Sequence, residues 1–236
     1  MLSLGGGWPL DYSLPTVDLA NYFADFLIGA YGPVTETWIN SNKPRPFGTA
    51  VLDGFDLDLE AEAWATGSNE LIYKNYDVFA QRIKSTSTML LSAAPQCVVP
   101  DARITPALKA VAFDFIFVQF YNTYECSAMK GYLDLSLHPT QATTFTFQAW
   151  LDFLKNNSAS PNAKLFLGLP AGPDGLPVHK EQYLTPTQAD FLISKYKNQP
   201  NFGGVMLWEA TVSVRNPEYC QSFGYWMKAS LDGTFA

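Results

Sequence analysis

Three acidic residues alternate along one short segment of the chain. Asp56, Asp58 and Glu60 are separated by single leucines. Side chains of a β-strand point alternately to its two faces, so the three carboxyl groups share one face and the leucines share the other. Carboxyl groups this close together cannot all ionise at low cost in free energy, so at least one is expected to keep its proton near neutral pH. A carboxyl group that stays protonated can serve as a general acid in catalysis.

Glu60 is the best candidate for this proton donor. It is the last of the three and lies nearest the carboxyl end of the expected strand, where α/β-barrel enzymes place their active sites. Asp58 would tune Glu60, and Asp56 would be the deeper member of the same relay. Acid catalysis of this kind needs no cofactor, and neither a cofactor nor a metal is predicted. A magnesium site formed by Asp56 and Asp58 is an alternative that the residue types leave open.

The segments that position these groups are short apolar runs that alternate with amphipathic helices. The runs are rich in β-branched and aromatic residues, which is typical of buried parallel strands. They cover Met1–Gly6, Val51–Glu60, Thr88–Gln96, Phe113–Asn122, Leu165–Pro170 and Gly203–Trp208. Strict alternation of strands and helices without a break in composition predicts one α/β domain with a parallel sheet. Six strand–helix units can be counted.

Four apolar stripes at helical spacing are predicted to face the core. They are Leu19, Phe23, Phe26, Leu27 and Ala30; Ile72, Tyr76, Phe79 and Ile83; Phe147, Trp150, Leu151 and Leu154; and Tyr219, Phe223, Trp226 and Met227. Thr185 and Gln188 fit a capping box at the start of a further helix, with Pro186 at its first position. Cys220 lies on the last stripe and is predicted to be a buried apolar residue.

Composition and charge exclude several classes of protein. The chain has 236 residues, of which 47% are hydrophobic, enough for one sizeable core. Its net charge of −7 argues against nucleic acid as a partner. No run of about 18 apolar residues occurs, so no membrane span is predicted, and residues 1–7 lack the pattern of a signal peptide. Three scattered cysteines predict neither a disulfide scaffold nor a zinc site, although one bridge and one free thiol fit them.

Several short motifs resemble those of one known family. Asp53–Glu60 resembles the Asp-x-x-Asp-x-Asp-x-Glu signature of the family 18 glycoside hydrolases, and Ser3–Gly6 resembles their Ser-x-Gly-Gly motif. Ser92–Cys97, Val118–Asn122 and Gly203–Trp208 are similar to segments of the class III chitinases of plants and fungi. The motifs occur in the family's order, and the resemblance covers nearly the whole chain. It implies a (β/α)₈ TIM-barrel type of fold, of which about six units are present.

The resemblance also implies a role for each matching residue of the acidic strand. Glu60 would protonate the glycosidic oxygen, and the nucleophile would be the 2-acetamido oxygen of the substrate itself. Asp58 would orient the acetamide N–H and stabilise its charge, with Asp56 behind it. Tyr121 would form a hydrogen bond with the acetamide carbonyl. The implied substrate is chitin or a chitooligosaccharide, and the protein is expected to act as a monomer.

Further matching residues are assigned to substrate binding and to a disulfide. The binding set comprises Gly5, Gly6, Gln119, Asn122 and Trp208, of which the tryptophan would stack beneath the sugar at the cleavage point. Cys97 and Cys126 match a disulfide pair of the class III members. Because a disulfide requires an oxidising compartment, the protein is expected to be extracellular.

The sequence leaves open the extent of the domain and two alternative functions. Ser3–Gly6 would belong to the third barrel strand, so residues 1–236 are expected to be a family 18 catalytic domain that lacks the first two strand–helix units. One alternative is a catalytically silent chitin-binding, sugar-binding or inhibitor protein on the same fold. Another is an endo-β-N-acetylglucosaminidase. Ser92–Cys97 and Gln119–Asn122 favour a chitinase over the latter, and the presence of Glu60 favours an enzyme over a silent protein.

Hydrolysis of chitin oligosaccharides should have an acidic pH optimum, because Glu60 must be protonated to donate its proton. The measurement is the initial rate as a function of pH. A rate that keeps rising to about pH 9 would contradict the assignment of Glu60 as general acid.

Overall fold

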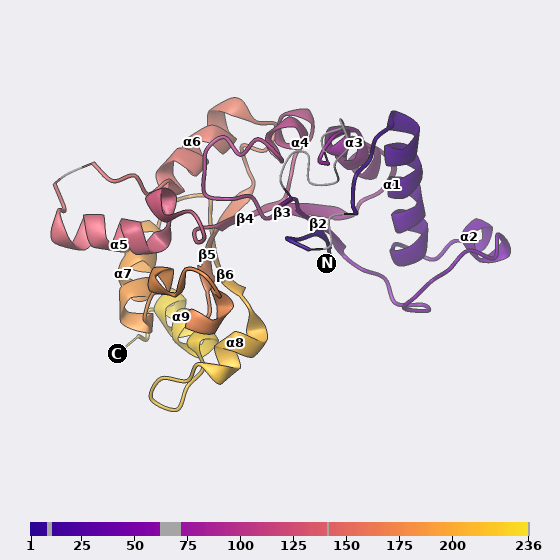
Figure 1. Cartoon of the computed structure of the whole chain (residues 1–236). Coiled ribbons are helices and arrows are strands. Elements are labelled where there is room, and N and C mark those ends of the chain that lie inside the picture. The colour runs from indigo at the N-terminus through magenta and orange to yellow at the C-terminus, as the bar shows by residue number, and fades with distance from the viewer. Residues whose placement is uncertain (9–10, 62–71, 141, 236) are drawn as a thin grey trace. The chain divides into compact units, whose positions relative to one another are not determined.

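In the part of the chain that the structure describes, six β-strands alternate with helices (Figure 1). The computed structural model describes residues 1–8, 11–61, 72–140 and 142–235. The chain divides into two compact units. The first unit holds Met1–Pro95, Ala102–Asp114 and Leu154–Ala163, and the second unit holds Gln96–Asp101, Phe115–Phe153 and Lys164–Ala236.

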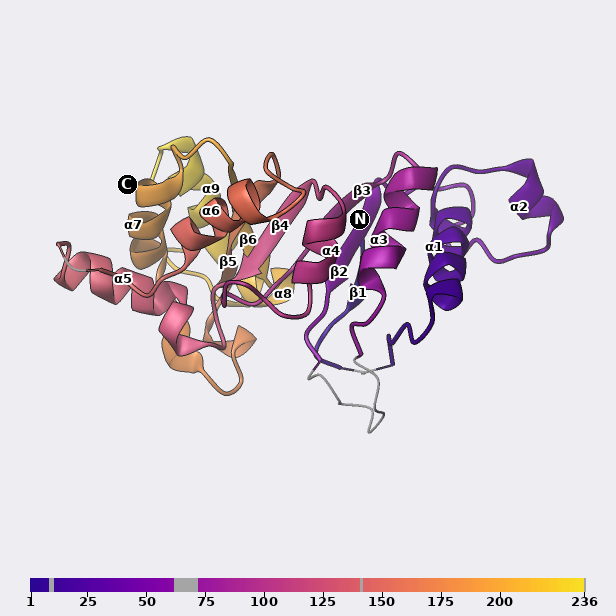
Figure 2. The ribbon, with the colours of Figure 1, turned by 90° about the horizontal axis from the view of Figure 1, so that it is seen from above.

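The first unit is built on three parallel strands with β2 in the middle. The strands are β1 (Leu2–Gly5), β2 (Gly54–Asp58) and β3 (Leu90–Ala93). The helices are α1 (Val17–Tyr31), α2 (Glu36–Asn40), α3 (Tyr76–Thr86) and α4 (Thr105–Ala110). Helices α1, α3 and α4 lie alongside the strands, with α3 packed against the other two (Figures 1 and 2).

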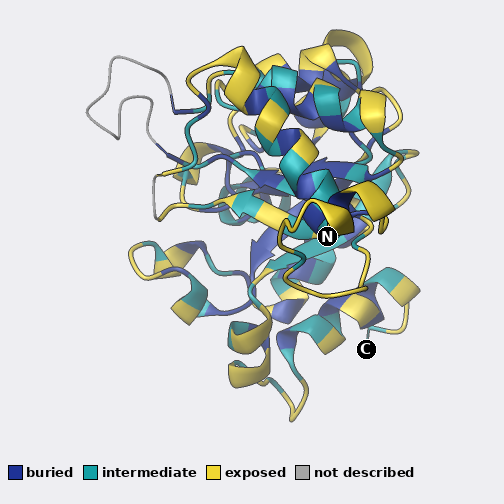
Figure 3. Ribbon diagram, turned by 90° about the vertical axis from the view of Figure 1, so that its right-hand side faces the viewer, coloured by how far each residue is buried: buried dark blue, intermediate teal, exposed yellow. Residues whose placement is uncertain are grey.

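The core of the first unit is rich in aromatic rings. Phe55 and Leu57 of β2 are buried, and so is Phe79 of α3, whose ring centroid lies 5.5 Å from that of Phe23. Most residues of β2 and β3 are buried, whereas β1 is of intermediate to high exposure and the outer surfaces of the helices are exposed (Figure 3). Because neighbouring residues of a strand point to opposite faces, burial of these apolar side chains turns the acidic residues of β2 to the other face.

The second unit is built on three further parallel strands with β5 in the middle. The strands are β4 (Phe115–Gln119), β5 (Lys164–Pro170) and β6 (Phe202–Trp208). The helices are α5 (Ala128–Leu137), α7 (Pro186–Tyr196), α8 (Ala210–Arg215) and α9 (Phe223–Asp232), with 3₁₀ turns at Tyr124–Cys126, Pro173–Gly175 and Lys180–Gln182. Helix α6 (Phe147–Asn157) begins in this unit, and its residues from Leu154 on belong to the first unit. None of the helices in the described ranges is long and apolar enough to cross a membrane.

All six predicted strands are confirmed, most of them shorter at the ends than their apolar runs. The capping box at the start of α7 is also confirmed: the Thr185 hydroxyl accepts a hydrogen bond from the Gln188 N–H, and the Gln188 side chain accepts one from the Thr185 N–H. The residues of the stripe at α3, Ile72, Tyr76, Phe79 and Ile83, are all buried as predicted, although Ile72 lies in the turn before the helix begins at Tyr76.

The predicted stripe of α1 is wrong at its first residue. Leu19 is 39% exposed, and the buried residues of the helix are Ala20, Ala24, Leu27 and Ala30. Three of these four are alanines, so the buried face is narrow and lets α1 approach its neighbours closely. A stripe chosen from the large apolar residues alone therefore places the buried face of α1 too far round the helix.

The predicted burial of Cys220 on a helical stripe is also wrong. Cys220 is exposed, and Tyr219 is 83% exposed. Both residues have positive φ angles, of 62° and 50°, between the paired residues Glu218 and Gln221. Two successive left-handed residues form a tight hairpin turn. Helix α9 therefore begins only after Ser222, whose hydroxyl accepts a hydrogen bond from the Tyr225 N–H.

Substituting Phe79 by alanine should lower the free energy of unfolding by about 3–5 kcal/mol, because it leaves a cavity in the packed core. Urea unfolding followed by circular dichroism measures this cost. Tyr22→Ala on the exposed side of α1 is the control, with an expected cost below about 1 kcal/mol. Equal costs for the two variants would show that the core of the first unit is not packed around Phe79.

Candidate active site

Asp56 accepts hydrogen bonds from serines of both neighbouring strands. The register pairs Ser3 of β1 with Asp56 of β2, and Asp56 with Ser92 of β3. The Ser3 hydroxyl donates a hydrogen bond to Asp56 Oδ2 at 2.7 Å, and the Ser92 hydroxyl donates one to Oδ1 at 2.6 Å. Ser92 is fully buried. Each carboxyl oxygen of Asp56 thus has its own donor, which fixes the orientation of the group.

Asp58 lies one row further along the strands and faces glycine. Gly5 pairs with Asp58, and the Gly6 N–H donates a hydrogen bond to the Asp58 carbonyl at 2.6 Å. Gly5 has a φ of 109°, and a Cβ at this residue would lie 2.1 Å from the Asp58 carbonyl oxygen. Only glycine allows β1 to approach β2 so closely in this conformation. The two glycines of the Ser-x-Gly-Gly segment therefore shape the backbone beside Asp58.

Glu60 lies two residues after the end of β2, between two buried residues. Leu59 and Ala61 are buried, whereas the Glu60 side chain is half-buried. A Cβ on Gly7 would lie 3.1 Å from Glu60 Oε2, so the backbone after β1 runs close to this carboxyl group. Burial alternates along the segment as predicted: Phe55, Leu57 and Leu59 are buried, whereas Asp56, Asp58 and Glu60 are partly exposed.

Tyr12 adjoins this group and was not identified from the sequence. Its hydroxyl oxygen accepts a hydrogen bond from the Ala61 N–H at 2.7 Å. Burial raises the pKa of this hydroxyl, and the main-chain N–H groups of Ala61 and Glu60 offset part of the rise. The carboxyl groups of Asp58 and Glu60 raise the pKa further. The hydroxyl is therefore neutral across the physiological pH range. Only its place shortly after β1 could have pointed to it in the sequence.

In the second unit, three predicted residues lie at the carboxyl end of β4. Gln119 and Tyr121 are buried, and Asn122 is exposed with a φ of 66°. The Gln119 side-chain oxygen accepts a hydrogen bond from Gln96 Nε2 at 3.3 Å. Gln96 lies within the Ser92–Cys97 motif, but the sequence assigned it no role. The structure adds it as a hydrogen-bond partner of Gln119.

Trp208 is the last residue of β6 and is 50% exposed. Its carbonyl oxygen accepts a hydrogen bond from the Ala171 N–H at 2.8 Å, and a Cβ on Gly175 would lie 2.9 Å from the same oxygen. The loop after β5 thus runs against Trp208 and holds its backbone. The following residue, Glu209, caps α8 by accepting hydrogen bonds from Thr211 N–H and Val212 N–H, which lower the pKa of its carboxyl group.

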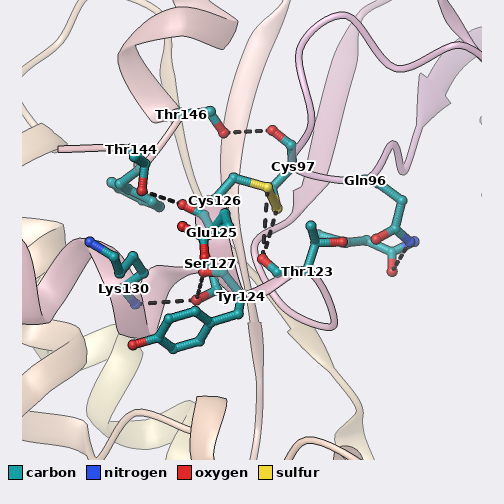
Figure 4. Close-up of a disulfide and its surroundings, with 12 residues drawn as sticks. Gln96, Cys97, Thr123, Tyr124, Glu125, Cys126, Ser127, Lys130, Thr144 and Thr146 are labelled. Carbon is teal, nitrogen blue, oxygen red and sulfur yellow. Dashed lines mark hydrogen bonds between the residues drawn. A yellow bond between two sulfur atoms is a disulfide. The ribbon is translucent and has the colours of Figure 1, made fainter.

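The disulfide between Cys97 and Cys126 is present, with a Cα–Cα distance of 5.7 Å (Figure 4). Both cysteines are buried. The Cys97 carbonyl accepts hydrogen bonds from the Thr146 hydroxyl at 2.5 Å and from Trp150 Nε1 at 3.2 Å. The bridge and these bonds join the loop after β3, the segment after β4 and the start of α6 within the second unit. Cys126 lies directly before Ser127, which caps α5.

The predicted residues fall into two groups. The first unit brings together Gly5, Gly6, Asp56, Asp58 and Glu60. The second unit holds Gln119, Tyr121, Asn122 and Trp208 at the carboxyl ends of its strands. Among the described residues, no group of three or more histidine, cysteine, aspartate or glutamate side chains is arranged to hold a metal ion.

Comparison with protein families and curated sequences gives one consistent result. Residues 1–175 match the family described as "Glycosyl hydrolases family 18". The chain is 45% identical over 221 residues to "Endochitinase A1" of Aspergillus fumigatus, covering 92% of this chain and 23% of that protein. It is 43% identical over 219 residues to "Endochitinase A" of Emericella nidulans, covering 91% of this chain and 21% of that protein. The chain thus spans about a quarter of the length of these relatives.

Solved structures with the same fold include both an inhibitor and an enzyme. A xylanase and α-amylase inhibitor protein from Scadoxus multiflorus is 28% identical, with a TM-score of 0.69 over all of this chain and 74% of that one. A chitinase from Ipomoea carnea is 26% identical, with a TM-score of 0.63 over 98% of this chain and 70% of that one. The predicted fold class, α/β of the barrel type, is confirmed.

Gly5→Ala should destabilise the chain more than Gly6→Ala. Both glycines have positive φ angles, of 109° and 101°, so alanine is strained at either residue by about 1–2 kcal/mol. Only the Gly5 methyl would clash with Asp58, because no atom lies within 4 Å of a Cβ on Gly6. Urea unfolding of the two variants separates the clash from the strain. Equal losses would contradict the close approach of β1 to Asp58.

Proposed function

Because the chain belongs to family 18 of the glycosyl hydrolases, we propose that it forms the catalytic part of a chitinase. The enzyme hydrolyses β-1,4 bonds between N-acetylglucosamine residues of chitin and chitooligosaccharides. The acidic face of β2 is the observation that carries the proposal, because it combines a fixed Asp56 with Asp58 and Glu60 at the end of the strand. The names of the relatives at 43–45% identity support it.

Glu60 is assigned the role of proton donor to the leaving glycosidic oxygen. Its half-buried side chain lies beyond the strand end, where a substrate can reach it. The substrate's 2-acetamido oxygen attacks the anomeric carbon and forms an oxazolinium intermediate, which water then opens with Glu60 as base. Asp58 orients the acetamide N–H and stabilises its developing positive charge. Asp56, held by Ser3 and Ser92, supports Asp58 from one row deeper.

The residues of the second unit are assigned by their match to the family's motifs. Tyr121 would donate its hydroxyl hydrogen to the acetamide carbonyl. Gln119 and Asn122 would line the floor of the site, and the exposed ring of Trp208 offers an apolar face for a sugar ring. Gly5 and Gly6 would border the substrate beside Asp58. This mechanism restricts the substrate, because a sugar without an N-acetyl group supplies no nucleophile.

Location, domain extent and oligomeric state belong to the same proposal. The Cys97–Cys126 disulfide supports an extracellular location, since such bridges persist in oxidising compartments. Residues 1–236 would form one family 18 catalytic domain with six of the strand–helix units of its barrel, acting as a monomer.

A catalytically silent sugar-binding or inhibitor protein is the second candidate function. It is favoured by one observation, that a protein with the same fold is described as an inhibitor of xylanase and α-amylase. The acidic residues argue for the enzyme, because a silent protein has no need of Glu60 beside a fixed Asp56. Hydrolysis of N-glycans by an endo-β-N-acetylglucosaminidase would use the same acidic strand, and release of free glycan from a glycoprotein would identify it.

Glu60→Gln should lower the rate of cleavage of a fluorogenic chitotrioside by about 10²–10⁴-fold, which is the usual contribution of a general acid. Glutamine keeps the size of the side chain but cannot donate the carboxyl proton. The measurement is release of the fluorophore by equal amounts of folded wild type and variant.

Glu36→Gln is the matched control, because Glu36 is an exposed residue of the same type in the first unit. It should retain the wild-type rate. A folded wild type that binds the chitotrioside without cleaving it would overturn the proposal and establish the silent sugar-binding function. A Glu60→Gln variant with the wild-type rate would overturn the assignment of the proton donor.

A further inference from the structure

The main chain of Ala61, the residue after Glu60, is bonded at its N–H and at its carbonyl by two side chains distant in sequence. The Ala61 N–H donates a hydrogen bond to the Tyr12 hydroxyl at 2.7 Å. The Ala61 carbonyl accepts one from Arg103 Nε at 2.9 Å. Tyr12 lies 49 residues before Ala61, and Arg103 lies 42 residues after it. Both belong to the first unit, together with β2.

These two bonds act where the strand pairing has ended. Strand β2 ends at Asp58; the Leu57 carbonyl accepts a hydrogen bond from the Ala94 N–H, and the Asp58 carbonyl accepts one from the Gly6 N–H. Glu60 comes two residues later, so its backbone lies outside this ladder. A backbone without ladder bonds needs other partners to keep its direction. The bonds from Tyr12 and Arg103 meet that need at Ala61, which is itself buried.

The segment that carries Tyr12 is bonded to residues at the start of α3, and Arg103 lies just before α4. The Tyr76 hydroxyl donates a hydrogen bond to the Tyr12 carbonyl at 2.6 Å, and the two rings meet edge to face at 6.5 Å. Asn75 Nδ2 donates another to the Leu14 carbonyl at 2.6 Å. Tyr12 is thereby attached to the start of α3. Arg103 precedes the fully buried Ile104 at the start of α4.

We propose that Tyr12 and Arg103 are positioning residues for Glu60, which hold the main-chain N–H and carbonyl of Ala61 and so aim the carboxyl group of the proton donor. This rests on the proposed function, because Glu60 must be the general acid. Neither residue touches the reacting atoms. Proton transfer requires the donor within hydrogen-bond reach of the leaving oxygen, and a displacement of about 1 Å can cost about a hundredfold in rate. Loss of either bond frees the backbone next to Glu60.

The first test is the steady-state kinetics of Tyr12→Phe on a chitooligosaccharide. This variant removes the hydroxyl and keeps the ring that packs on Tyr76. We expect kcat to fall by about tenfold to a hundredfold, with KM changed by less than about threefold, because substrate binding does not depend on the direction of Glu60. Tyr22→Phe, at an exposed tyrosine of α1, is the control and should keep the wild-type kcat.

Arg103 gives a second, independent comparison. Arg103→Ala should lower kcat as Tyr12→Phe does, and Arg103→Lys should restore part of it, because lysine can still donate to the Ala61 carbonyl. Arg82→Ala is the control, since Arg82 bonds to Asp25 on the surface. A kcat within twofold of the wild type in folded Tyr12→Phe and Arg103→Ala would overturn the proposal. So would a rise in KM with an unchanged kcat.

The bond itself can be tested without any hydrolysis. Hydrogen exchange of the Ala61 amide, followed by NMR, should be at least about tenfold faster in Tyr12→Phe than in the wild type and unchanged in Tyr22→Phe. If the wild type does not hydrolyse chitooligosaccharides, the proposed function fails, and the exchange measurement still decides whether Tyr12 holds Ala61. Unchanged exchange in Tyr12→Phe would overturn the positioning role. Should Tyr12→Phe fail to fold, Arg103→Lys and Arg103→Ala carry both measurements.

Discussion

The parallel register of β1, β2 and β3 is the constraint on which the acidic face depends. It brings a serine hydroxyl from each neighbouring strand to Asp56 and sets Gly5 opposite Asp58. A shift of one residue in either pairing would turn the serine of that neighbouring strand away from Asp56 to the other face. Backbone pairing therefore positions Asp56 and Asp58. Glu60 is not itself paired, but it follows the paired strand by two residues, so its position depends on the same register.

Local patterns explain why much of this arrangement was predictable. The six strands coincide with short apolar runs that stand out in the sequence, and the alternation of Asp56, Asp58 and Glu60 follows from the period of a strand. Helix α5 was missed because its buried residues are Ala128 and Gly131, which form no large apolar stripe. A Cβ on Gly131 would lie 2.5 Å from the Phe145 ring, so only a glycine lets the helix pack this closely against Phe145.

Long-range contacts explain what was not predictable. The bond between Tyr12 and Ala61 joins a loop to a strand end 49 residues away, and no spacing in the sequence announces it. The cysteines left several pairings open, and only the family resemblance singled out Cys97 with Cys126. The exposed hairpin at Cys220 was missed because its left-handed turn interrupts what looks like a helical stripe.

Retention of configuration is the central claim of the mechanism, because it follows from attack by the substrate's own acetamide with Glu60 as the acid and base. Proton NMR of a chitooligosaccharide digest, recorded before mutarotation, identifies the anomer that is released first. The acidic face of β2 predicts the β-anomer as the initial product. Initial release of the α-anomer would mean direct attack by water, and would contradict the roles given to Asp58 and Glu60.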